Sequence, residues 1–425
     1  MTSPEENVPG VGSLLISWAL EYDTQKIVHI KNKTIGFLNR LIQLAIVAYV
    51  IGYAIIYKKA YQSTDTVISS VTTKLKGVSY TNISGLPDLN IKDTTPYDRI
   101  WDVSDYVVPP QQSNAFFVMT NMIITPNQQR GQCPEDPRVP NVGCTPAKES
   151  QDCVKGEPVI NGNGVRTGKC VPYYYPNGTE TYTCEIEAWC PVEYDVNPTQ
   201  SEPVLKDAKR FTVLIKNTAT YPKFHFSKRN ILESSNKSYL SGCMYNNETD
   251  PFCPIFKLGD IVAATGEDFN KLAYSGGVIG ISINWDCNLD YSWKDCTPLY
   301  TFSRIDNSEA KLAKGYNFRF SNYYQNETGI DTRTLFKAYG ILFEVIVTGT
   351  AGKFDFVPLM LNIGTGLALL TMSTVACDII VCYIMKGHEY YKKKKYLTVK
   401  PDAEVNVDYE PLDNASVCSK ETNEE

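Results

Sequence analysis

The stretches LIQLAIVAYVIGYAIIY at Leu41–Tyr57 and FVPLMLNIGTGLALLTMSTVAC at Phe356–Cys377 decide the fold class of this chain of 425 residues. At about 1.5 Å per residue, a helix over the first stretch would reach about 26 Å and a helix over the second about 33 Å. Both lengths are sufficient to cross the hydrocarbon core of a bilayer. The sequence therefore predicts two membrane-spanning helices with one large domain between them.

The segment between the two stretches holds ten of the thirteen cysteines, namely Cys133, Cys144, Cys153, Cys170, Cys184, Cys190, Cys243, Cys253, Cys287 and Cys296. An even number of cysteines in an oxidising compartment favours five disulfides. The pairs Cys243–Cys253 and Cys287–Cys296 are close enough to staple short loops, whereas spacing leaves the pairing of the first six open. The Cys-x-x-Cys and Cys/His spacings that are typical of zinc sites do not occur here. The other three cysteines, Cys377, Cys382 and Cys418, should be reduced.

Glycosylation sequons place the same segment outside the cell. Five of them lie in it, at Asn82, Asn177, Asn236, Asn247 and Asn326, and two others at Asn32 and Asn414 lie outside it, where they should be silent. No secretory signal peptide precedes the first stretch, so we expect an uncleaved signal anchor. Basic residues before the first stretch and after the second fit the positive-inside rule, although Lys58 and Lys59 lie on the predicted outer side.

These observations predict a plasma-membrane protein that crosses the bilayer twice and has both termini in the cytoplasm. The expected segments are a cytoplasmic N-terminus (1–34), a first transmembrane helix (35–57), an extracellular domain (58–353), a second transmembrane helix (354–384) and a cytoplasmic tail (385–425). The tetralysine Lys392–Lys395 is expected to stop transfer or, alternatively, to bind anionic lipid. The acidic, polar tail beyond Pro401 is expected to be disordered.

The extracellular segment is expected to be mainly β. Runs rich in Val, Ile, Phe and Tyr recur between Gly, Pro and Asn at Asn114–Ile124, Phe211–Asn217, Gly277–Trp285, Tyr316–Tyr324 and Ala338–Thr348. The first run is almost continuously apolar, which suits a strand buried on both faces. Short helices are expected near Ile100–Ser104 and Asp268–Tyr274. The segment Gln128–Asn163 is rich in Pro, Gly and Cys and is expected to form a disulfide-tied lobe.

Catalytic motifs are missing from the sequence, so we expect no enzyme. It has no Gly-x-Ser-x-Gly or His-Glu-x-x-His motif, and of its three histidines only His225 lies in the extracellular segment. GTAGK at Gly349–Lys353 lacks the first glycine and the Ser or Thr of a phosphate-binding loop. We expect it to be a flexible joint that leads into the second span.

Cations that lie in strand-forming runs are better candidates for a site. Lys74 and Lys76 alternate in VTTKLKG, and since residues i and i+2 of a strand share a face, both ammonium groups should point the same way. Arg319 lies in YNFRF and Lys337 in LFKAYG. Convergence of such cations would bind a polyanion such as a nucleoside triphosphate. Spacing alone does not bring Lys74 near Lys337, and a cation of this kind taken by itself is more often a solvated surface charge.

Ordered strings from about Tyr22 to Tyr391 resemble the P2X (ionotropic purinergic) receptors, a family of ATP-gated cation channels. The strings are Tyr22-x-Thr24-x-Lys26, VTTKLKG, CEIEAWCPVE, FTVLIKN, CPIFKLGDIV, GGVIGISINWDCNLD, YNFRF and GTAGKFD, with GLALL and CDIIV in the second span. The resemblance implies a homotrimer, with heterotrimers also open, that is gated by extracellular ATP and passes sodium, potassium and calcium. It implies no cofactor and no nucleic-acid partner, and it leaves a modulatory divalent metal open.

The resemblance also implies roles for individual residues. ATP would bind where two subunits meet, with Lys74, Lys76, Thr212 and Leu214 from one copy and Asn317, Arg319 and Lys337 from its neighbour. The lysines and the arginine would hold the phosphates, and Thr212 and Leu214 would contact the adenine. The implied disulfides are Cys133–Cys190, Cys144–Cys170, Cys153–Cys184, Cys243–Cys253 and Cys287–Cys296. Thr24 would be phosphorylated, and Tyr391-x-x-x-Lys395 would act as a surface-retention signal.

The second span is expected to line the pore. Leu361 and Thr365 match family positions near the closed gate, and helical spacing places Ala368 or Leu369 on the same stripe. Asn362 and the glycines at 364 and 366 offer polar and small residues where helices meet. Asp378 is the costliest residue in the span, and it is expected either to attract cations or to fix a helix contact near the cytosolic end.

Three other kinds of protein fit parts of the pattern. A proton- or peptide-gated trimeric channel shares the two spans and the cysteine-rich domain, but it would give the cations above no role. A nucleotide-hydrolysing ectoenzyme would release phosphate from ATP. An adhesion protein would need neither Asp378 nor a polar stripe in the second span.

Overall fold

The computed structural model describes residue 30 and residues 32–83, 93–175, 177–199, 202–231 and 237–395. The chain divides into two compact units. One unit contains both candidate spans and comprises Met1–Tyr61 and Phe356–Glu425. The other unit is Gln62–Asp355.

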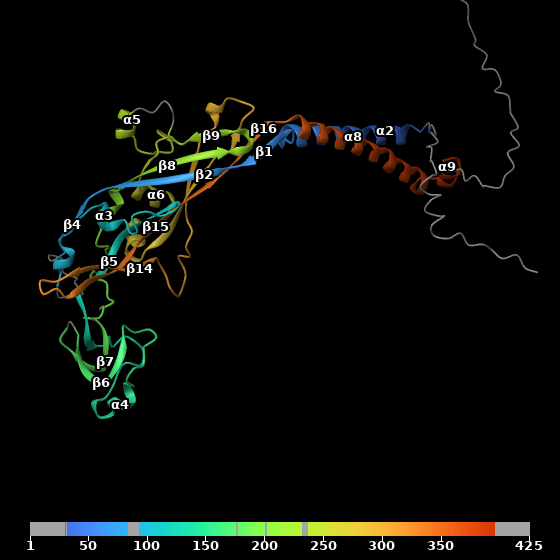
Figure 1. Ribbon diagram of the computed structural model, residues 1–425. Helices are drawn as coiled ribbons and strands as arrows, with labels where there is room; N and C mark the ends of the chain where they lie inside the picture. Colours follow the sequence, from blue (N-terminus) through green and yellow to red (C-terminus); the bar gives the residue numbers. More distant parts are fainter. Residues whose placement is uncertain are drawn as a thin grey trace, which may run out of the picture. The chain divides into compact units, whose positions relative to one another are not determined.

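Two helices that are long and apolar enough to cross a membrane form the first unit. The first candidate span consists of α2 (Lys33–Ala48) and the π-helical segment η1 (Tyr49–Tyr57). The second consists of α8 (Phe356–Ile379) and the π-helical segment η7 (Ile380–Ile384), and a short helix, α9 (His388–Lys395), follows it. Figure 1 shows α2 and α8 side by side, in agreement with the contacts between them.

Most apolar side chains of the two spans have no cover from the rest of the chain. Leu44 is 72% exposed and Leu361 is 65% exposed. Such a surface needs lipid or other copies of the chain around it. Gly366 is an exception, since a Cβ atom there would come within 3.0 Å of Val50 Cγ1. The glycine lets the two helices approach closely, as small residues do in membranes.

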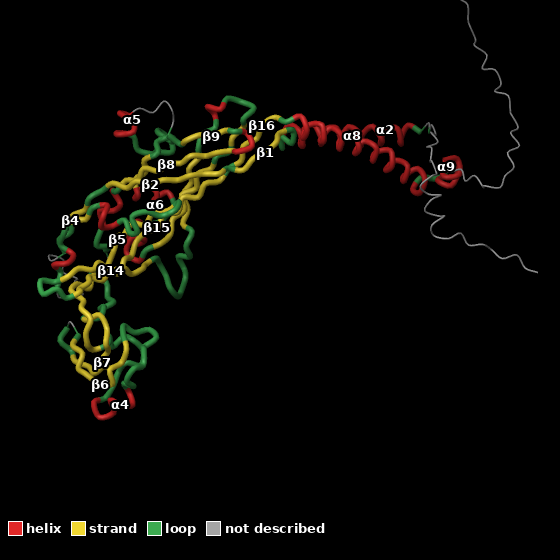
Figure 2. The backbone as a smooth tube through the Cα atoms, viewed as in Figure 1, coloured by secondary structure: helices red, strands yellow, loops and turns green. Residues whose placement is uncertain are grey.

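The second unit is mainly β, as the sequence predicted, and Figure 2 shows how strands dominate it. Its strands are β1 (Gln62–Thr66), β2 (Ile68–Lys76), β3 (Ser79–Tyr80), β4 (Ile100–Trp101), β5 (Ala115–Pro134), β6 (Val165–Tyr174), β7 (Glu180–Cys190), β8 (Thr212–Tyr221), β9 (Phe226–Arg229), β10 (Ile255–Lys257), β11 (Gly277–Asn284), β12 (Cys287–Asn288), β13 (Leu299–Arg304), β14 (Asn317–Gln325), β15 (Asp331–Thr348) and β16 (Thr350–Phe354). Its helices in the described residues are short: α3 (Val103–Tyr106), α4 (Glu149–Asp152), α5 (Lys237–Gly242), α6 (Leu258–Ala264) and α7 (Phe269–Ser275).

In the part of the chain that the structure describes, the strands form four sheets. The largest has the order β13-β11-β15-β5-β7-β6, with β14 pairing with β15. All its ladders are antiparallel except that of β11 with β15. A second sheet has the order β10-β8-β2, with β9 beside β8, a third has the order β1-β16-β12, and β3 pairs with β4.

Each of the five apolar runs forms a strand, and the first is buried on both faces as expected. Phe116 to Ile124 are all buried, and they pack against β11, β15 and the short helices. Strand β5 also continues to Pro134, into the segment that was expected to form a disulfide-tied lobe. There it pairs with β7, which in turn pairs with β6. Cross-strand partners far away in the sequence stabilise this extension, and local composition does not reveal them.

The GTAGK segment is not the flexible joint that the sequence suggested, because Gly349 follows β15 directly and the other four residues belong to β16. At Gly349 φ is +145°, and a Cβ atom there would come within 2.2 Å of the Trp285 carbonyl oxygen. At Gly352 a Cβ atom would come within 2.4 Å of the Gln62 side chain. Gly349 therefore allows close backbone packing where β15 passes into β16, and Gly352 lies within a regular strand, so neither glycine marks a flexible joint.

Candidate functional site

Strands β2 and β8 place four of the candidate site residues on one face of a sheet. In this antiparallel ladder Lys76 pairs with Thr212 and Lys74 pairs with Leu214, and paired residues share a face. Both lysines are exposed, and Thr212 and Leu214 are half-buried. The alternate residues, Leu75 and Val213, are buried in the core. Two ammonium groups thus stand directly beside a threonine and an apolar side chain, and Figure 1 shows the two strands together.

A further cation lies on the same face. Lys216 pairs with Thr72, one step along the ladder from Lys74, and it is exposed. We did not single out this residue from the sequence. The signal was present in the alternation Thr212-x-Leu214-x-Lys216, since residues two apart on a strand share a face. We name the exposed side of Thr72, Lys74, Lys76, Thr212, Leu214 and Lys216 the lysine face.

Strands β14 and β15 bring together the other candidate cations. Arg319 pairs with Lys337 across this ladder, and Asn317 pairs with Tyr339. Arg319 Nε donates to Glu193 Oε2 over 2.6 Å, and Lys337 Nζ lies 2.6 Å from Asp195 Oδ1. Arg319 Nη2 also lies 3.6 Å from Asp195 Oδ2. We name Glu193, Asp195, Arg319 and Lys337 the charge cluster.

Burial differs sharply within the charge cluster. The side chain of Glu193 is only 6% exposed, whereas that of Arg319 is 47% exposed. A buried carboxylate without a partner is costly, whereas a half-exposed guanidinium can be solvated by water. Loss of the ion pair would therefore destabilise Glu193 more than Arg319. Asp195 is partly exposed and lies between the two cations. The cations therefore have acidic partners that an anionic ligand would have to displace.

The pKa values of the two cations agree with this geometry. Burial by itself would lower the pKa of Arg319, but its hydrogen bond to Glu193 and the negative charges of Glu193 and Asp195 raise it. Burial would likewise lower the pKa of Lys337, but hydrogen bonds with Asp195 and Tyr339 raise it. Both side chains therefore stay charged near neutral pH.

The lysine face and the charge cluster belong to different sheets of the same chain. Among the described residues, no hydrogen bond or ion pair connects the two groups. Asn317 is exposed beside the charge cluster. Glu193 and Asp195 were not identified from the sequence, and the string CPVE offered no signal that these carboxylates would meet cations more than a hundred positions away.

In the second span, Leu361, Thr365, Ala368 and Leu369 of α8 are all exposed along one stripe. Asn362 lies apart from this stripe, because its Nδ2 donates to the carbonyls of Ala60, over 2.9 Å, and Pro358, over 2.8 Å. This amide ties the second span to the end of the first.

Asp378 forms an ion pair with Lys395 of α9. A second contact joins the same elements, since Lys392 Nζ lies 5.2 Å from the centre of the Tyr383 ring. The Tyr391-x-x-x-Lys395 motif thus lies on a helix that contacts the end of the second span. Thr24, in the motif near the N-terminus, lies outside the described residues.

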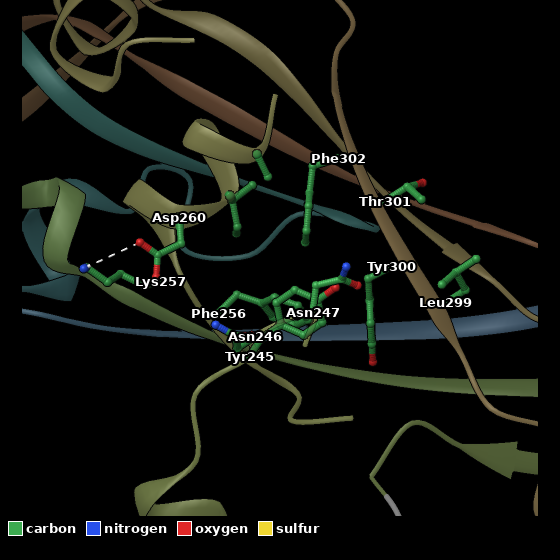
Figure 3. Close-up of a pocket in the computed structure, with 12 residues that line it drawn as sticks. Tyr245, Asn246, Asn247, Phe256, Lys257, Asp260, Leu299, Tyr300, Thr301 and Phe302 are labelled. Atoms are coloured by element: carbon green, nitrogen blue, oxygen red, sulfur yellow. Dashed lines mark ion pairs between the residues drawn. The ribbon is translucent and has the colours of Figure 1, made fainter. Parts of the chain in front are cut away.

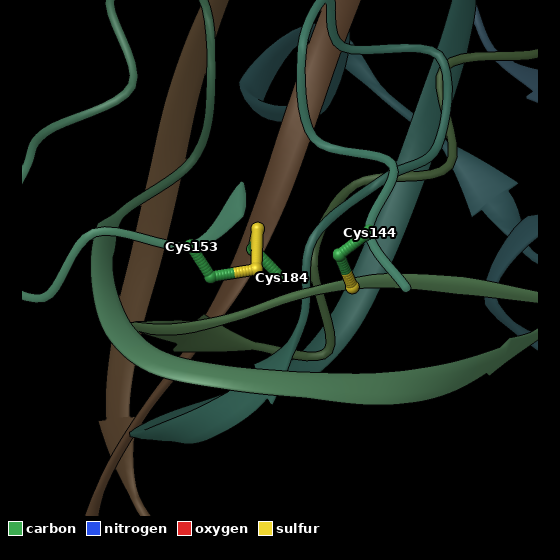
Figure 4. A group of neighbouring side chains, drawn as sticks. All are labelled: Cys144, Cys153 and Cys184. Atoms are coloured by element: carbon green, nitrogen blue, oxygen red, sulfur yellow. A yellow bond between two sulfur atoms is a disulfide. The ribbon is translucent and has the colours of Figure 1, made fainter. Parts of the chain in front are cut away.

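The structure contains the five disulfides that the resemblance implied. They are Cys133–Cys190, Cys144–Cys170, Cys153–Cys184, Cys243–Cys253 and Cys287–Cys296. Sulfur atoms of Cys144, Cys153 and Cys184 lie within 4.8 Å of one another (Figure 4). All three are oxidised, so the group offers no thiolate, which is the form that binds metal. In the group of Cys243, Asp250 and Cys253, both cysteines are joined in a disulfide, so this group offers no thiolate to a metal either.

Of the five sequons expected to be extracellular, Asn82, Asn177, Asn247 and Asn326 lie in the described residues, and Asn236 does not. Asn177 accepts a hydrogen bond from Thr179 Oγ1 over 2.7 Å, and Asn326 accepts one from Thr328 Oγ1 over 2.7 Å. Asn247 is exposed in a tight turn.

Comparisons with known proteins agree on one family. The chain matches the family model described as ATP P2X receptor over residues 20–398. It is 50% identical over 394 residues to P2X purinoceptor 4 of Mus musculus, which covers 92% of this chain and 96% of the relative. It is 44% identical over 382 residues to P2X purinoceptor 5 of Homo sapiens, which covers 89% of this chain and 82% of the relative.

Two solved structures are also similar. One is an invertebrate P2X receptor from the Gulf Coast tick in the presence of ATP and Zn²⁺, with a TM-score of 0.76 and 47% identity, covering 81% of this chain and 99% of that one. The other is the chicken ATP-gated P2X7 receptor channel in the presence of the competitive antagonist TNP-ATP. Its TM-score is 0.70 and its identity 37%, and the match covers 82% of this chain and 100% of that one. The similarity extends over both candidate spans and the domain between them.

Proposed function

The chain belongs to the ATP P2X receptor family and is an ATP-gated cation channel of the plasma membrane, and from this premise we propose how its residues bind ATP and open a pore. The working unit is a homotrimer, and heterotrimers with related subunits are open to it. Both termini lie in the cytoplasm, with extracellular residues 58–353 between spans at residues 35–57 and 354–384. ATP acts as a ligand and is not hydrolysed.

ATP binds where the lysine face of one copy meets the charge cluster of its neighbour. Lys74 and Lys76 of one copy and Arg319 and Lys337 of the other contribute four cations, which offset the roughly four negative charges of ATP. Asn317 adds a hydrogen-bond donor beside them. The ladder of β2 with β8 supports this arrangement, because it sets the phosphate-binding lysines directly opposite Thr212 and Leu214, which receive the adenine.

Lys216 extends the cationic surface. It lies one ladder step beyond Lys74 on the same face, so that it can reach the phosphates or the ribose from the adenine side. Its charge also raises the local concentration of anions in front of the site.

The observation that carries the proposal is the pairing of Arg319 and Lys337 with Glu193 and Asp195. Without ATP, these carboxylates hold the cations in place and keep them charged. When ATP binds, its phosphates take over the cations, and Glu193 loses the partner that stabilised it in a buried position. The free energy of ATP binding is therefore the difference between the free energy of the phosphate–cation pairs that form and that of the carboxylate–cation pairs that break.

The third sheet connects ATP binding to the spans. Strand β1 begins at Gln62, directly after the first span unit, and pairs with β16, which ends at Phe354, two residues before α8. Gln62 Nε2 donates to Asp290 over 2.6 Å, and Asp290 accepts from the Phe354 backbone over 2.5 Å. The strand carrying Lys74 follows β1 after one residue. A movement of the lysine face is thus transmitted to both linkers at once.

In the trimer, α8 lines the pore, with Leu361, Thr365, Ala368 and Leu369 facing it. Leu361 and Thr365 form the narrow closed gate, and Asn362 holds the second span to the first while it moves. Sodium, potassium and calcium pass when the spans separate. The hydroxyl of Thr365 in the pore lining and the carboxylate of Asp378 favour cations over anions. Lys392–Lys395 also meet anionic lipid at the inner leaflet.

A divalent metal modulates the channel without acting as a cofactor. The support is the tick receptor, whose structure was determined in the presence of Zn²⁺. The two clusters of potential ligands in the described residues contain disulfide sulfur, so carboxylates are the better ligands here.

The test is the whole-cell current of cells that express the chain, held at a negative potential during a brief ATP pulse at neutral pH. We expect an inward cation current that Lys74→Ala weakens and that Lys311→Ala, a change at an exposed lysine outside both sheets, preserves. Equal surface expression of all variants is the control. No current under ATP, with a current under an acid pulse or phosphate release from ATP, would instead support a proton-gated channel or an ectoenzyme.

A further inference from the structure

An aromatic pocket lies in the extracellular unit, away from the lysine face and the charge cluster. Its volume is about 580 Å³. Strand β10, strand β13, helix α6 and the turn at Tyr245–Asn247 form its walls. Figure 3 shows the lining side chains, with Lys257 and Asp260 forming an ion pair among them. This volume lies within the range of about 300–1,000 Å³ that is usual for sites that bury a small ligand.

The floor of the pocket consists of four packed rings. The ring centres of Tyr245 and Phe256 lie 4.7 Å apart, and those of Phe256 and Tyr300 lie 5.0 Å apart. Phe302 completes the group, 5.8 Å from Tyr245. Polar groups surround these rings, namely the amides of Asn246 and Asn247, the Lys257–Asp260 pair and the Thr301 hydroxyl. Aromatic faces with hydrogen-bonding groups around them suit the apolar C–H face and the hydroxyls of a sugar ring.

The pocket contains its own attachment point for a sugar. Asn247 is the acceptor of the sequon Asn247-Glu248-Thr249, and it lines the pocket. The neighbouring Asn246 is engaged in the turn, since its Oδ1 accepts from the backbone N–H groups of Glu248 and Thr249 over 2.9 and 3.0 Å. The Asn247 side chain makes no hydrogen bond to any described residue, so its amide is available for modification.

The turn that carries Asn247 is held firmly beside the pocket. Asn246 and Asp250 exchange backbone hydrogen bonds of 3.3 and 3.0 Å, and the disulfide Cys243–Cys253 closes the loop around them. Tyr245 N also donates to the Ile255 carbonyl over 2.7 Å. A sugar on Asn247 therefore starts at the pocket wall and needs little extra ordering to enter, which reduces the entropic cost of binding.

We propose that the N-linked glycan of Asn247 places its first N-acetylglucosamine in this aromatic pocket and covers the rings of Tyr245 and Phe302, which are only half-buried. The sugar is held by stacking on the rings and by hydrogen bonds to the polar groups around them. This inference requires that residues 58–353 be extracellular, but it does not depend on the proposed ATP site.

The pocket is distinct from the lysine face. Phe256 pairs with Val213 on the ladder of β10 with β8, so the two share a face, and Val213 is fully buried. Thr212 and Leu214 point to the opposite side of the same sheet. A sugar in the pocket therefore lies behind the sheet whose front carries the proposed adenine contacts.

The test compares Thr249→Ala, which abolishes the sequon, with Thr249→Ser, which keeps it. The Thr249 side chain is exposed and makes no hydrogen bond to a described residue, so both changes should spare the fold. Each variant also carries Ala264→Cys in the pocket wall, and the rate of reaction with a charged, membrane-impermeant thiol reagent is measured on the full-length channel. Gln111→Cys, at an exposed site outside the pocket, is the matched control.

We expect the thiol in the Thr249→Ala channel to react about tenfold faster if the sugar otherwise leaves the pocket for about a tenth of the time. The Gln111→Cys thiol should react equally fast in both backgrounds. Trimming with an endoglycosidase that leaves one N-acetylglucosamine should preserve the protection. Equal rates at Ala264→Cys, loss of protection after trimming, or an unmodified Asn247 in the mass spectrum of the Thr249→Ser channel would overturn the proposal.

Discussion

Removing the charge of Glu193 should make the channel more sensitive to ATP. Glu193→Gln keeps the size of the side chain but weakens its hold on Arg319, which donates over 2.6 and 3.3 Å. A hydrogen bond between charged groups contributes about 1.5–3 kcal/mol. Because Arg319 is about half exposed, screening reduces this to about 1 kcal/mol, and each 1.4 kcal/mol corresponds to a factor of ten. We therefore expect the half-maximal ATP concentration to fall about fivefold.

The assay is an ATP dose–response of the current, combined with ATP binding to the purified trimer, so that a change in binding is separated from a change in gating. Glu187→Gln is the control, because Glu187 forms an exposed pair with Arg130 over 3.1 Å on the neighbouring strand. It should leave both curves in place. A rightward or unchanged binding curve for Glu193→Gln, with normal surface expression, would refute the idea that this carboxylate competes with ATP.

The remaining predictions concern other parts of the chain. Lys216→Ala should raise the half-maximal ATP concentration severalfold and Lys216→Arg should largely preserve it, as measured by dose–response at equal surface expression. Burial raises the pKa of Tyr97 to about 12, so the folded state favours its neutral form. The free energy of unfolding that this group contributes should be present below pH 10 and be lost as the pH rises from about 10 to 12. Alkaline unfolding of the solubilised channel, followed by near-ultraviolet absorbance, checks this. Asp378→Asn and Lys395→Gln should each shift the gating equilibrium, and the double variant should resemble either single one, because both break the same ion pair; additive shifts in a double-mutant cycle would contradict the pairing.

The sequence predicted those features that local pattern determines. Apolar runs of sufficient length gave both spans, and the continuous run at Asn114–Ile124 correctly indicated a strand buried on both faces. The alternation of Lys74 and Lys76 correctly placed both on one exposed face.

The sequence could not predict pairings between distant segments. Arg319 meets Glu193 across 126 positions and Lys337 meets Asp195 across 142, and nothing local to either residue encodes the partner. The register of β2 on β8 likewise depends on both strands, and only that register brings Lys216 next to Lys74. For the same reason the apolar run at Asn114–Ile124 did not reveal that β5 extends to Pro134, where it pairs with β7. GTAGK was misjudged because its glycines looked flexible, whereas the backbone of Trp285 lies too close to Gly349 for a side chain there.

The central claim is that ATP binds between copies, with the lysine face from one and the charge cluster from the next. Co-expression of Lys74→Ala and Arg319→Ala subunits tests it directly, with binding of radiolabelled ATP to purified trimers as the measurement. Each variant alone loses every complete site, but a mixed trimer regains one, where an intact Lys74 faces an intact Arg319. We predict that the mixture restores high-affinity ATP binding. If mixed trimers bind ATP no better than either variant alone, the site lies within a single copy and the account is wrong.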